Sequence, residues 1–159
     1  MHVSSRHHLR SDEVRDLEAT LADAFGVDLD ADAYELVELE DTDFDLVLVD
    51  GAPLVCYVDG EVCLTVRGAN ATSPSRGRVV VDAGAISFVS DGADVMRPGI
   101  VEVDEGVAAE DLVLVVEETH GKALAVGRAL VDGAEMTGNE GRVVSSLHHV
   151  GDDLYELDV

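Results

Sequence analysis

Lysine, cysteine, tryptophan and long hydrophobic runs are all scarce in this sequence of 159 residues. Lys122 is the one lysine, two cysteines and three prolines are present, and tryptophan is absent. No segment approaches the ~18 consecutive apolar residues that a membrane span needs. Residues 1–8 also lack the apolar core of a secretory signal. We therefore expect a cytoplasmic protein that does not enter a membrane and whose thiols stay reduced.

Acidic residues far outnumber basic residues in this chain. Asp and Glu number 34 against 10 Lys and Arg, which gives a formal net charge of −24 at pH 7. The acidic residues are spread over both halves, and a hydrophobic fraction of 47% argues against disorder. This composition favours the cytoplasm of a halophile, where salt screens the repulsion between carboxylates. The alternative is an acidic protein that binds basic partners.

The first half of the chain predicts one helix followed by an antiparallel sheet. Apolar residues recur every three or four positions from Val14 to Phe25, and the helix is expected to begin at Ser11 and to end at Gly26. The small, polar segment Gly68–Ser75 is interpreted as a linker. Strands separated by Asp- and Gly-rich turns are expected at 35–39, 44–49, 54–58 and 61–66. These features predict an α+β domain over residues 1–75 and a second domain over 76–159.

The two cysteines lie on either side of an expected hairpin turn. Asp59-Gly60 is typical of a two-residue turn, and counting outward from it pairs Cys56 with Cys63 across the two strands. The alternatives for this pair are a disulfide or half of a metal site. Two packed thiols are favoured, because a tetrahedral zinc site needs further ligands and no histidine is near in sequence.

The second half predicts a small, closed β-barrel with one early helix. A strand at 79–81 leads to Asp82, which suits a helix N-cap, and Gly92 suits the left-handed position that ends the helix. The strand that follows is interrupted by a turn at Arg97-Pro98-Gly99. Further strands are expected at 112–116, 123–130, 142–150 and 154–157, with a helical turn at 132–136, and the strand at 112–116 is expected to be buried on both faces.

The segment Gly92–Ile100 reads Gly-Ala-Asp-Val-Met-Arg-Pro-Gly-Ile and closely resembles the signature of PUA domains. These are RNA-binding β-barrels found in pseudouridine synthases and archaeosine transglycosylases. The whole chain is similar to archaeal PUA proteins that carry an additional N-terminal (pre-PUA) domain, whose eukaryotic relatives are the malignant T-cell amplified sequence proteins and ligatin. The resemblance implies RNA binding, to tRNA or to ribosomal RNA of the small subunit, together with a partner protein in translation.

The resemblance also implies where RNA is held, namely between the early helix, the glycine-rich strand and the closing strands. The implied positions are Gly84, Ser87, Gly92, Ala93, Asp94, Met96, Arg97, Pro98 and Gly99. Basic residues of the same half are further candidates, because a guanidinium suits phosphate and stacks on bases; these are Arg78, Lys122, Arg128 and Arg142. For each arginine except Arg97, the equal alternative is a solvated partner for one of the many carboxylates.

No sequence pattern indicates catalysis. Nucleophile-elbow, phosphate-loop and zinc-protease motifs are missing. His148 and His149 are adjacent on an expected strand, so they face opposite ways and one of them is expected to face the core. His7 and His8 are expected to lie in a flexible leader. We therefore expect no cofactor, no metal and no enzymatic activity, and we expect a monomer.

Two functions of different class remain open. The first is a stand-alone RNA-binding translation factor that acts on tRNA or on the small ribosomal subunit. The second is a non-catalytic specificity subunit that delivers RNA to a separate pseudouridine synthase or transglycosylase. A third option is a protein-interaction module whose barrel no longer binds RNA. The acidity does not exclude RNA, because in molar salt the Debye length falls to ~3 Å and shape, stacking and hydrogen bonds must dominate binding.

Overall fold

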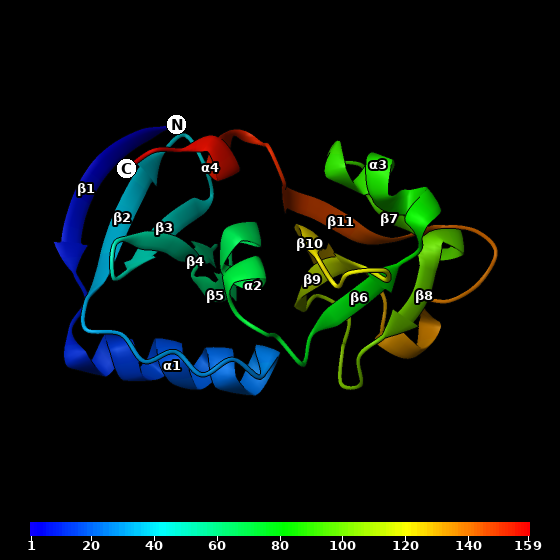
Figure 1. Ribbon diagram of the computed structural model, residues 1–159, viewed down its shortest axis with the longest axis horizontal. Coiled ribbons are helices and arrows are strands. Elements are labelled where there is room, and N and C mark those ends of the chain that lie inside the picture. Colours follow the sequence, from blue (N-terminus) through cyan, green and yellow to red (C-terminus); the bar gives the residue numbers. More distant parts are fainter.

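The computed structural model describes residues 1–159 as two sheets that lie next to each other, with a long helix beneath the first (Figure 1). The first sheet has five strands paired in chain order, all antiparallel. Its strands are β1 (His2–His8), β2 (Tyr34–Glu40), β3 (Phe44–Val49), β4 (Ala52–Val58) and β5 (Glu61–Leu64). The helix is α1 (Ser11–Phe25), and together with the sheet it forms the expected N-terminal α+β arrangement.

Helix α1 follows the predicted apolar spacing. Leu17, Leu21 and Phe25 are buried against the sheet, and Gly26 ends the helix in a left-handed conformation with φ of 65°. The N-cap is Arg10, so Ser11 is the first helical residue, and the Glu13 carboxylate accepts from the Arg10 N–H at 3.0 Å. An acidic third residue that reaches back in this way satisfies one of the free N–H groups at the start of the helix.

The second sheet has six strands in the order β7-β11-β10-β9-β6-β8. The edge strands β7 and β8 follow each other in the chain and are joined by the turn η2 (Arg97–Gly99), so the sheet forms a nearly closed barrel. Only β6 and β9 pair in parallel. The strands are β6 (Arg78–Val81), β7 (Val95–Met96), β8 (Ile100–Val103), β9 (Leu112–Glu117), β10 (Ala123–Ala129) and β11 (Arg142–His149). This confirms the expected α+β class with a small barrel.

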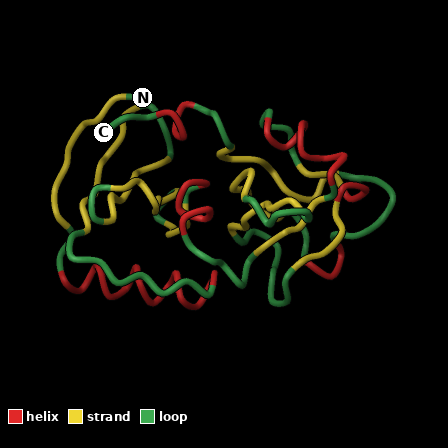
Figure 2. The backbone as a smooth tube through the Cα atoms, viewed as in Figure 1, coloured by secondary structure: helices red, strands yellow, loops and turns green.

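Short helical segments connect the strands or follow the last one (Figure 2). They are α2 (Val66–Ala71), η1 (Ala83–Ala85), α3 (Ile86–Ser90), η3 (Gly133–Glu135) and α4 (Asp153–Glu156). None of the helices is long and apolar enough to cross a membrane. Helix α3 follows directly on η1, as the expected early helix does, and Asp82 caps this segment by accepting from the Ala85 N–H at 3.1 Å.

Three segments differ from the sequence-based expectation. Residues 2–8 are not a flexible leader but the edge strand β1, which pairs with β2. The first part of the expected linker belongs to helix α2, because Thr65 caps it by accepting from the Gly68 N–H at 2.9 Å. The last expected strand is helix α4, because Asp152 accepts from the Tyr155 N–H at 2.8 Å and begins a helical turn there.

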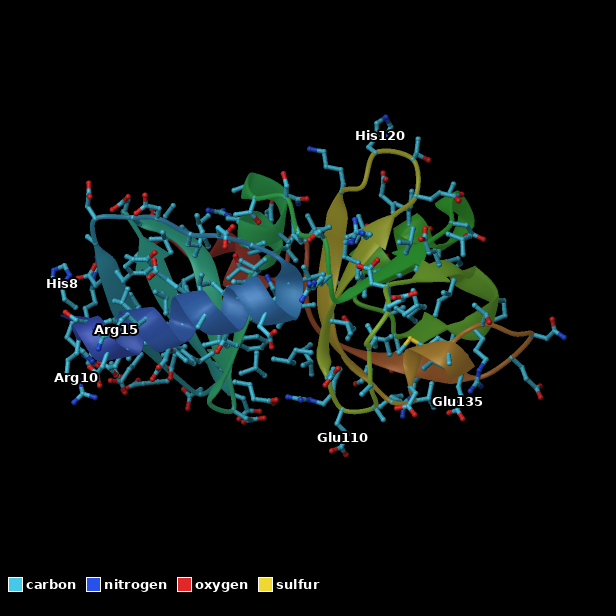
Figure 3. All side chains as sticks on the ribbon, turned by 90° about the horizontal axis from the view of Figure 1, so that it is seen from below. His8, Arg10, Arg15, Glu110, His120 and Glu135 are labelled. Atoms are coloured by element: carbon cyan, nitrogen blue, oxygen red, sulfur yellow. The ribbon has the colours of Figure 1, made fainter.

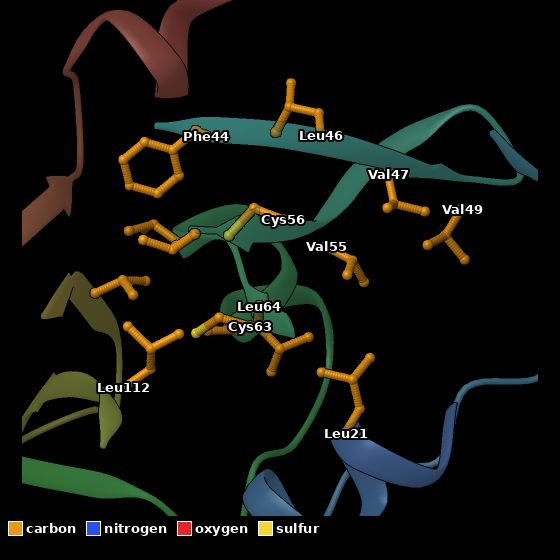
Figure 4. Close-up of a cluster of buried hydrophobic side chains, with 14 of the residues drawn as sticks. Leu21, Phe44, Leu46, Val47, Val49, Val55, Cys56, Cys63, Leu64 and Leu112 are labelled. Carbon is orange, nitrogen blue, oxygen red and sulfur yellow. The ribbon is translucent and has the colours of Figure 1, made fainter. Parts of the chain in front are cut away.

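One of the two apolar core clusters spans both sheets. Strand β9 is buried at all six positions, as expected. Val113 and Val115 face the interior of the barrel, whereas Leu112, Leu114 and Val116 pack in a cluster with residues of the first sheet and of α1. Figure 4 shows Leu112 facing the side chains of the first sheet. The two sheets are therefore held together by an apolar interface.

Two polar contacts fasten α2 at this interface. The Nε2 atom of His148 accepts from the Val66 N–H at 3.2 Å, and its Nδ1 atom lies 2.9 Å from Asp152. The amide of Asn70 bonds both the N–H and the carbonyl of Ala123, at 2.8 and 3.1 Å. His148 is 1% exposed, which confirms that one of the paired histidines faces the core.

The cysteine hairpin also matches its prediction. Cys56 and Cys63 are direct partners on β4 and β5, and both are buried, free thiols (Figure 4). The pKa of Cys56 is well above its ordinary value because Cys63 bonds to it and because burial disfavours the thiolate. Neither thiol is exposed for reaction, so the pair packs the core.

Candidate nucleic-acid interface

A groove of about 360 Å³ opens on the barrel between helix α3 and the turn η2. Its walls come from the signature segment and from the η1–α3 segment before it. The lining residues are Asp82, Gly84, Ala85, Phe88, Val89, Ala93, Asp94, Val95, Met96, Pro98 and Gly99. Six residues expected from sequence to contact RNA therefore meet in one place: Gly84, Ala93, Asp94, Met96, Pro98 and Gly99.

The floor of the groove depends on a close approach between η1 and η2. The Asp82 N–H donates to the Gly99 carbonyl at 2.9 Å, which draws the two turns together. A Cβ atom on Gly99 would lie 3.2 Å from the Cβ of Ala85. Glycine is needed here because a larger side chain would push against Ala85 and occupy the groove.

Gly92 ends α3 in the left-handed region, with φ of 94°, which confirms the expected positive φ. A Cβ atom at this position would lie 2.8 Å from Nε2 of His149. The His149 ring is held in turn by a contact of 3.0 Å between its Nδ1 and the Val150 carbonyl. Gly92 therefore allows α3 to pack tightly on β11.

Two apolar side chains of the groove are exposed to an unusual degree. Phe88 is 67% exposed and Met96 is 48% exposed. Phe88 stands on the outer side of the short helix α3, next to Val89, which is 2% exposed and faces the core. An exposed phenyl ring beside an apolar groove is a platform on which a nucleobase can stack. Sequence analysis did not single out Phe88. The one feature that could have indicated it is an aromatic residue between Ser87 and the buried Val89 in a short helix.

Asp94 joins the groove to strand β11. One carboxylate oxygen accepts from the Ser146 N–H at 2.8 Å, and the other accepts from Nη1 of Arg142 at 2.9 Å. The N–H of Ser146 and the guanidinium of Arg142 together hold the pKa of Asp94 below its ordinary value. Arg142 lies opposite Met96 in the pairing of β11 with β7, which places its guanidinium at the rim of the groove.

Arg97 does not line the groove. Its Nε donates to the Glu135 carbonyl at 2.8 Å, and its Nη1 donates to the Glu140 carbonyl at 3.0 Å. Its backbone N–H donates to the Gly141 carbonyl at 2.9 Å. The side chain that the sequence favoured most for RNA is thus bonded within the protein, to the loop that leads into β11.

The other expected basic residues lie away from the groove. Arg78 makes two contacts with Asp104, at 2.6 and 3.1 Å. Arg128 pairs with Glu61 of the first sheet at 2.8 Å. Lys122 is exposed in the turn between β9 and β10, the turn that carries His120 at the edge of the molecule (Figure 3). The remaining two expected positions, Ser87 and Gly92, flank the groove in sequence but do not line it.

A larger hollow of about 1190 Å³ lies between α1 and the barrel, and it is strongly acidic. Its lining includes seven carboxylates against one arginine, Arg76, which donates to the Asp23 carbonyl at 3.3 Å. The carboxylates are Glu13, Asp16, Asp23, Glu61, Asp104, Glu105 and Asp111. Phosphate would be repelled there, so this hollow is a poor place for RNA.

Comparison with known proteins supports the assignment of the barrel. Residues 77–151 match the model of the PUA domain family. An uncharacterized protein of Methanocaldococcus jannaschii is 39% identical over 160 residues, which cover 99% of each chain. Translation machinery-associated protein 20 of Saccharomyces cerevisiae is 30% identical over 132 residues, 79% of this chain and 72% of the yeast protein.

A solved structure shows the same fold over the whole chain. The conserved PUA domain protein of Thermoplasma acidophilum superposes with a TM-score of 0.80 at 27% identity and covers 95% of this chain and 97% of its own. The chain therefore belongs to the PUA domain proteins, and within them it is related to the translation machinery-associated protein 20 and malignant T-cell-amplified sequence group.

Proposed function

We propose that this protein is a non-catalytic RNA-binding factor of translation that holds an unpaired nucleotide of tRNA or of small-subunit ribosomal RNA in the groove beside α3. Phe88 gives the strongest support, because its side chain is 67% exposed at the edge of an apolar groove. The relationship to translation machinery-associated protein 20 supports a role in translation.

The groove suits a base better than a phosphate. Its lining is mostly apolar and small, and the two charged side chains within it, Asp82 and Asp94, are carboxylates. A base stacked on Phe88 gains dispersion and buries apolar surface, whereas Gly84 and Gly99 leave room for the ribose to approach the backbone. The phosphates must then lie outside, toward a cation at the rim.

The charge of −24 defines the conditions in which this binding occurs. We propose that the protein works in a cytoplasm of molar salt, as a monomer. There the long-range repulsion between carboxylates and RNA is screened, and stacking persists because it does not depend on net charge.

The more acidic first half, residues 1–75, is proposed to face a protein partner, such as protein on the surface of the small ribosomal subunit.

Substitution of Phe88 tests the groove directly. Phe88→Ala is expected to weaken binding of unfractionated tRNA by ~1–3 kcal/mol, the usual range for a stacked base. Val101→Ala is the matched control, because Val101 is an exposed apolar residue, 46% accessible, that does not line the groove. Equal affinity of Phe88→Ala and Val101→Ala, both folded, would overturn the proposal.

The RNA itself can be identified by crosslinking in molar KCl followed by sequencing of the bound RNA. Co-purification then separates the two modes of action. Recovery of ribosomal proteins supports a translation factor. Recovery of the catalytic subunit of a modification enzyme instead would assign the chain to RNA modification.

A further inference from the structure

We propose that Arg142 binds the phosphate of the nucleotide whose base occupies the groove, and that Arg97 holds the loop that sets Arg142 in place. This inference rests on the proposed function and adds a phosphate position to it. Sequence analysis favoured Arg97 for contact with RNA. The contacts of the two side chains instead leave Arg142 free to bind RNA, whereas Arg97 is bonded to the protein.

Most N–H donors of the Arg142 guanidinium have no partner in the protein. It is the first residue of β11, its side chain is 56% exposed, and Nη1 donates to Asp94 at 2.9 Å. No other guanidinium N–H group of Arg142 has a partner in the protein. A guanidinium carries five N–H donors in a planar fork that matches two phosphate oxygens, so most of this fork is available to a ligand.

Asp94 fixes the direction of this fork. Its carboxylate is itself held at 2.8 Å by the N–H of Ser146, which lies further along the same strand as Arg142. Because Asp94 also lines the groove, the guanidinium bonded to it stands directly beside the groove. Ordering of the arginine before RNA arrives reduces the side-chain entropy that binding would otherwise cost.

The other arginines near the barrel are either committed to the protein or, as Arg76 is, placed at the acidic hollow. Arg97 uses Nε and Nη1 to bond two carbonyl groups, and Arg78 uses Nε and Nη2 in a bidentate contact with Asp104. Arg128 bonds Glu61 and the Glu110 carbonyl. Arg142 is thus the arginine that combines an exposed, largely unpaired fork with a position at the rim.

Arg97 acts on Arg142 through the chain. The loop of residues 135–141 wraps around the Arg97 guanidinium so closely that a Cβ atom on Gly141 would lie 2.6 Å from its Nη1. The backbone N–H of Arg97 donates to the carbonyl of Gly141, the residue directly before Arg142, and the guanidinium Nη1 of Arg97 donates to the Glu140 carbonyl one residue earlier. These contacts fix the start of β11 and so the origin of the Arg142 side chain. Arg97 is therefore a positioning residue.

The test compares full-length variants for binding of unfractionated tRNA over a series of KCl concentrations. Arg142→Gln is expected to weaken binding roughly 5- to 100-fold and to reduce the slope of log K against log[KCl] by about 1, as loss of one phosphate contact does. Arg142→Lys keeps the charge and is expected to retain the slope with intermediate affinity. Arg15→Gln, an exposed arginine of α1 at the far end of the molecule (Figure 3), is the control and is expected to change neither quantity.

Arg97→Gln separates the two roles. It is expected to lower Tm, because the loop loses two hydrogen bonds, and to weaken tRNA binding less than Arg142→Gln does, because Arg142 is less well ordered. The salt slope is expected to stay unchanged, because Arg142 keeps its charge. A reduced slope with unchanged Tm for Arg97→Gln would reverse the assignment. If Phe88→Ala weakens binding while Arg142→Gln behaves like Arg15→Gln, the proposed phosphate position is wrong, but the proposed binding of a base in the groove is retained. If Phe88→Ala and Arg142→Gln are both without effect, the proposed function itself fails.

Discussion

Asp94 illustrates how single residues combine structure and function in this site. It lines the groove, extends the short pairing of β7 with β11 through the Ser146 N–H, and orients Arg142. Asp82 and Gly92, at either end of the η1–α3 segment, were both predicted from sequence, because capping and left-handed positions have strong residue preferences. Phe88 and the bonding of Arg97 were not, because they depend on contacts between distant segments.

The first prediction concerns Asp94 and pH. Its pKa is lowered in the folded protein, mainly by the Ser146 N–H and then by Arg142. The stability that its charge contributes is therefore present above the unfolded value of ~3.9 and is lost as pH falls through the lower folded pKa. We expect Asp94→Asn to reduce the free energy of unfolding by about 1 kcal/mol at pH 7 and by less as pH falls below about 4.

Urea denaturation of the wild-type protein and of Asp94→Asn, at pH 7 and at pH 3, measures this difference directly. The amide oxygen introduced by the substitution can still accept from the Ser146 N–H, so the comparison isolates the charge. If the difference in unfolding free energy is the same at both pH values, the charge of Asp94 does not stabilise the protein as proposed.

The second prediction concerns Gly92. Gly92→Val is expected to destabilise the protein by ~2–4 kcal/mol, because the valine meets both an unfavourable φ and the His149 ring. Gly106→Val is the control: Gly106 has a similar φ of 88°, but a Cβ there meets nothing within 4 Å. Thermal unfolding should show the larger loss for Gly92→Val, and equal losses would mean that packing on His149 is unimportant.

At the scale of elements, periodicity and turn chemistry predicted most of the fold. Helix α1, the β4–β5 hairpin and the doubly buried β9 all carry local patterns that the tertiary structure keeps. Strand β1 and helices α2 and α4 were missed, because their own patterns are weak. They form because Thr65 and Asp152 cap the helices and because β2 offers a free edge to β1.

The third prediction concerns the strength of β1. None of its seven residues is buried, and it is held by the ladder with β2 and by an ion pair of 2.7 Å between Arg6 and Glu35. Strands with little buried surface open at low free energy. We expect hydrogen exchange, read by mass spectrometry, to be much faster in β1 than in β9. Comparable protection of the two strands would show that β1 does not open at low free energy.

At the scale of the whole molecule, the first sheet and the outer face of the barrel share one core cluster, and the interior of the barrel forms a second. Leu114 of β9 is fully buried in the cluster that also holds α1 and the first sheet, and α2 is bonded to the barrel through Asn70 and His148. Sequence analysis predicted two units joined by a linker at Gly68–Ser75, and the first part of that segment packs as helix α2. A run of small and polar residues looks the same whether it connects or packs. A barrel fragment of residues 76–159 would expose the apolar face of β9.

The fourth prediction follows from this shared core. We expect the protein to unfold in one cooperative transition, with calorimetric and van't Hoff enthalpies in agreement. Leu114→Ala should lower the free energy of unfolding by ~2–5 kcal/mol, through lost burial and the cavity left behind, without splitting the transition. Two separate transitions in calorimetry would show that the sheets unfold independently.

The proposed function places RNA in the groove beside α3. Crosslinking by ultraviolet light of the full-length protein to unfractionated tRNA in molar KCl, followed by mass spectrometry of the crosslinked peptides, tests it most directly. RNA bound in the groove should crosslink within residues 84–99, with Phe88 and Met96 foremost, and near Arg142. Crosslinks confined to the first sheet, or to the acidic hollow between α1 and the barrel, would contradict it.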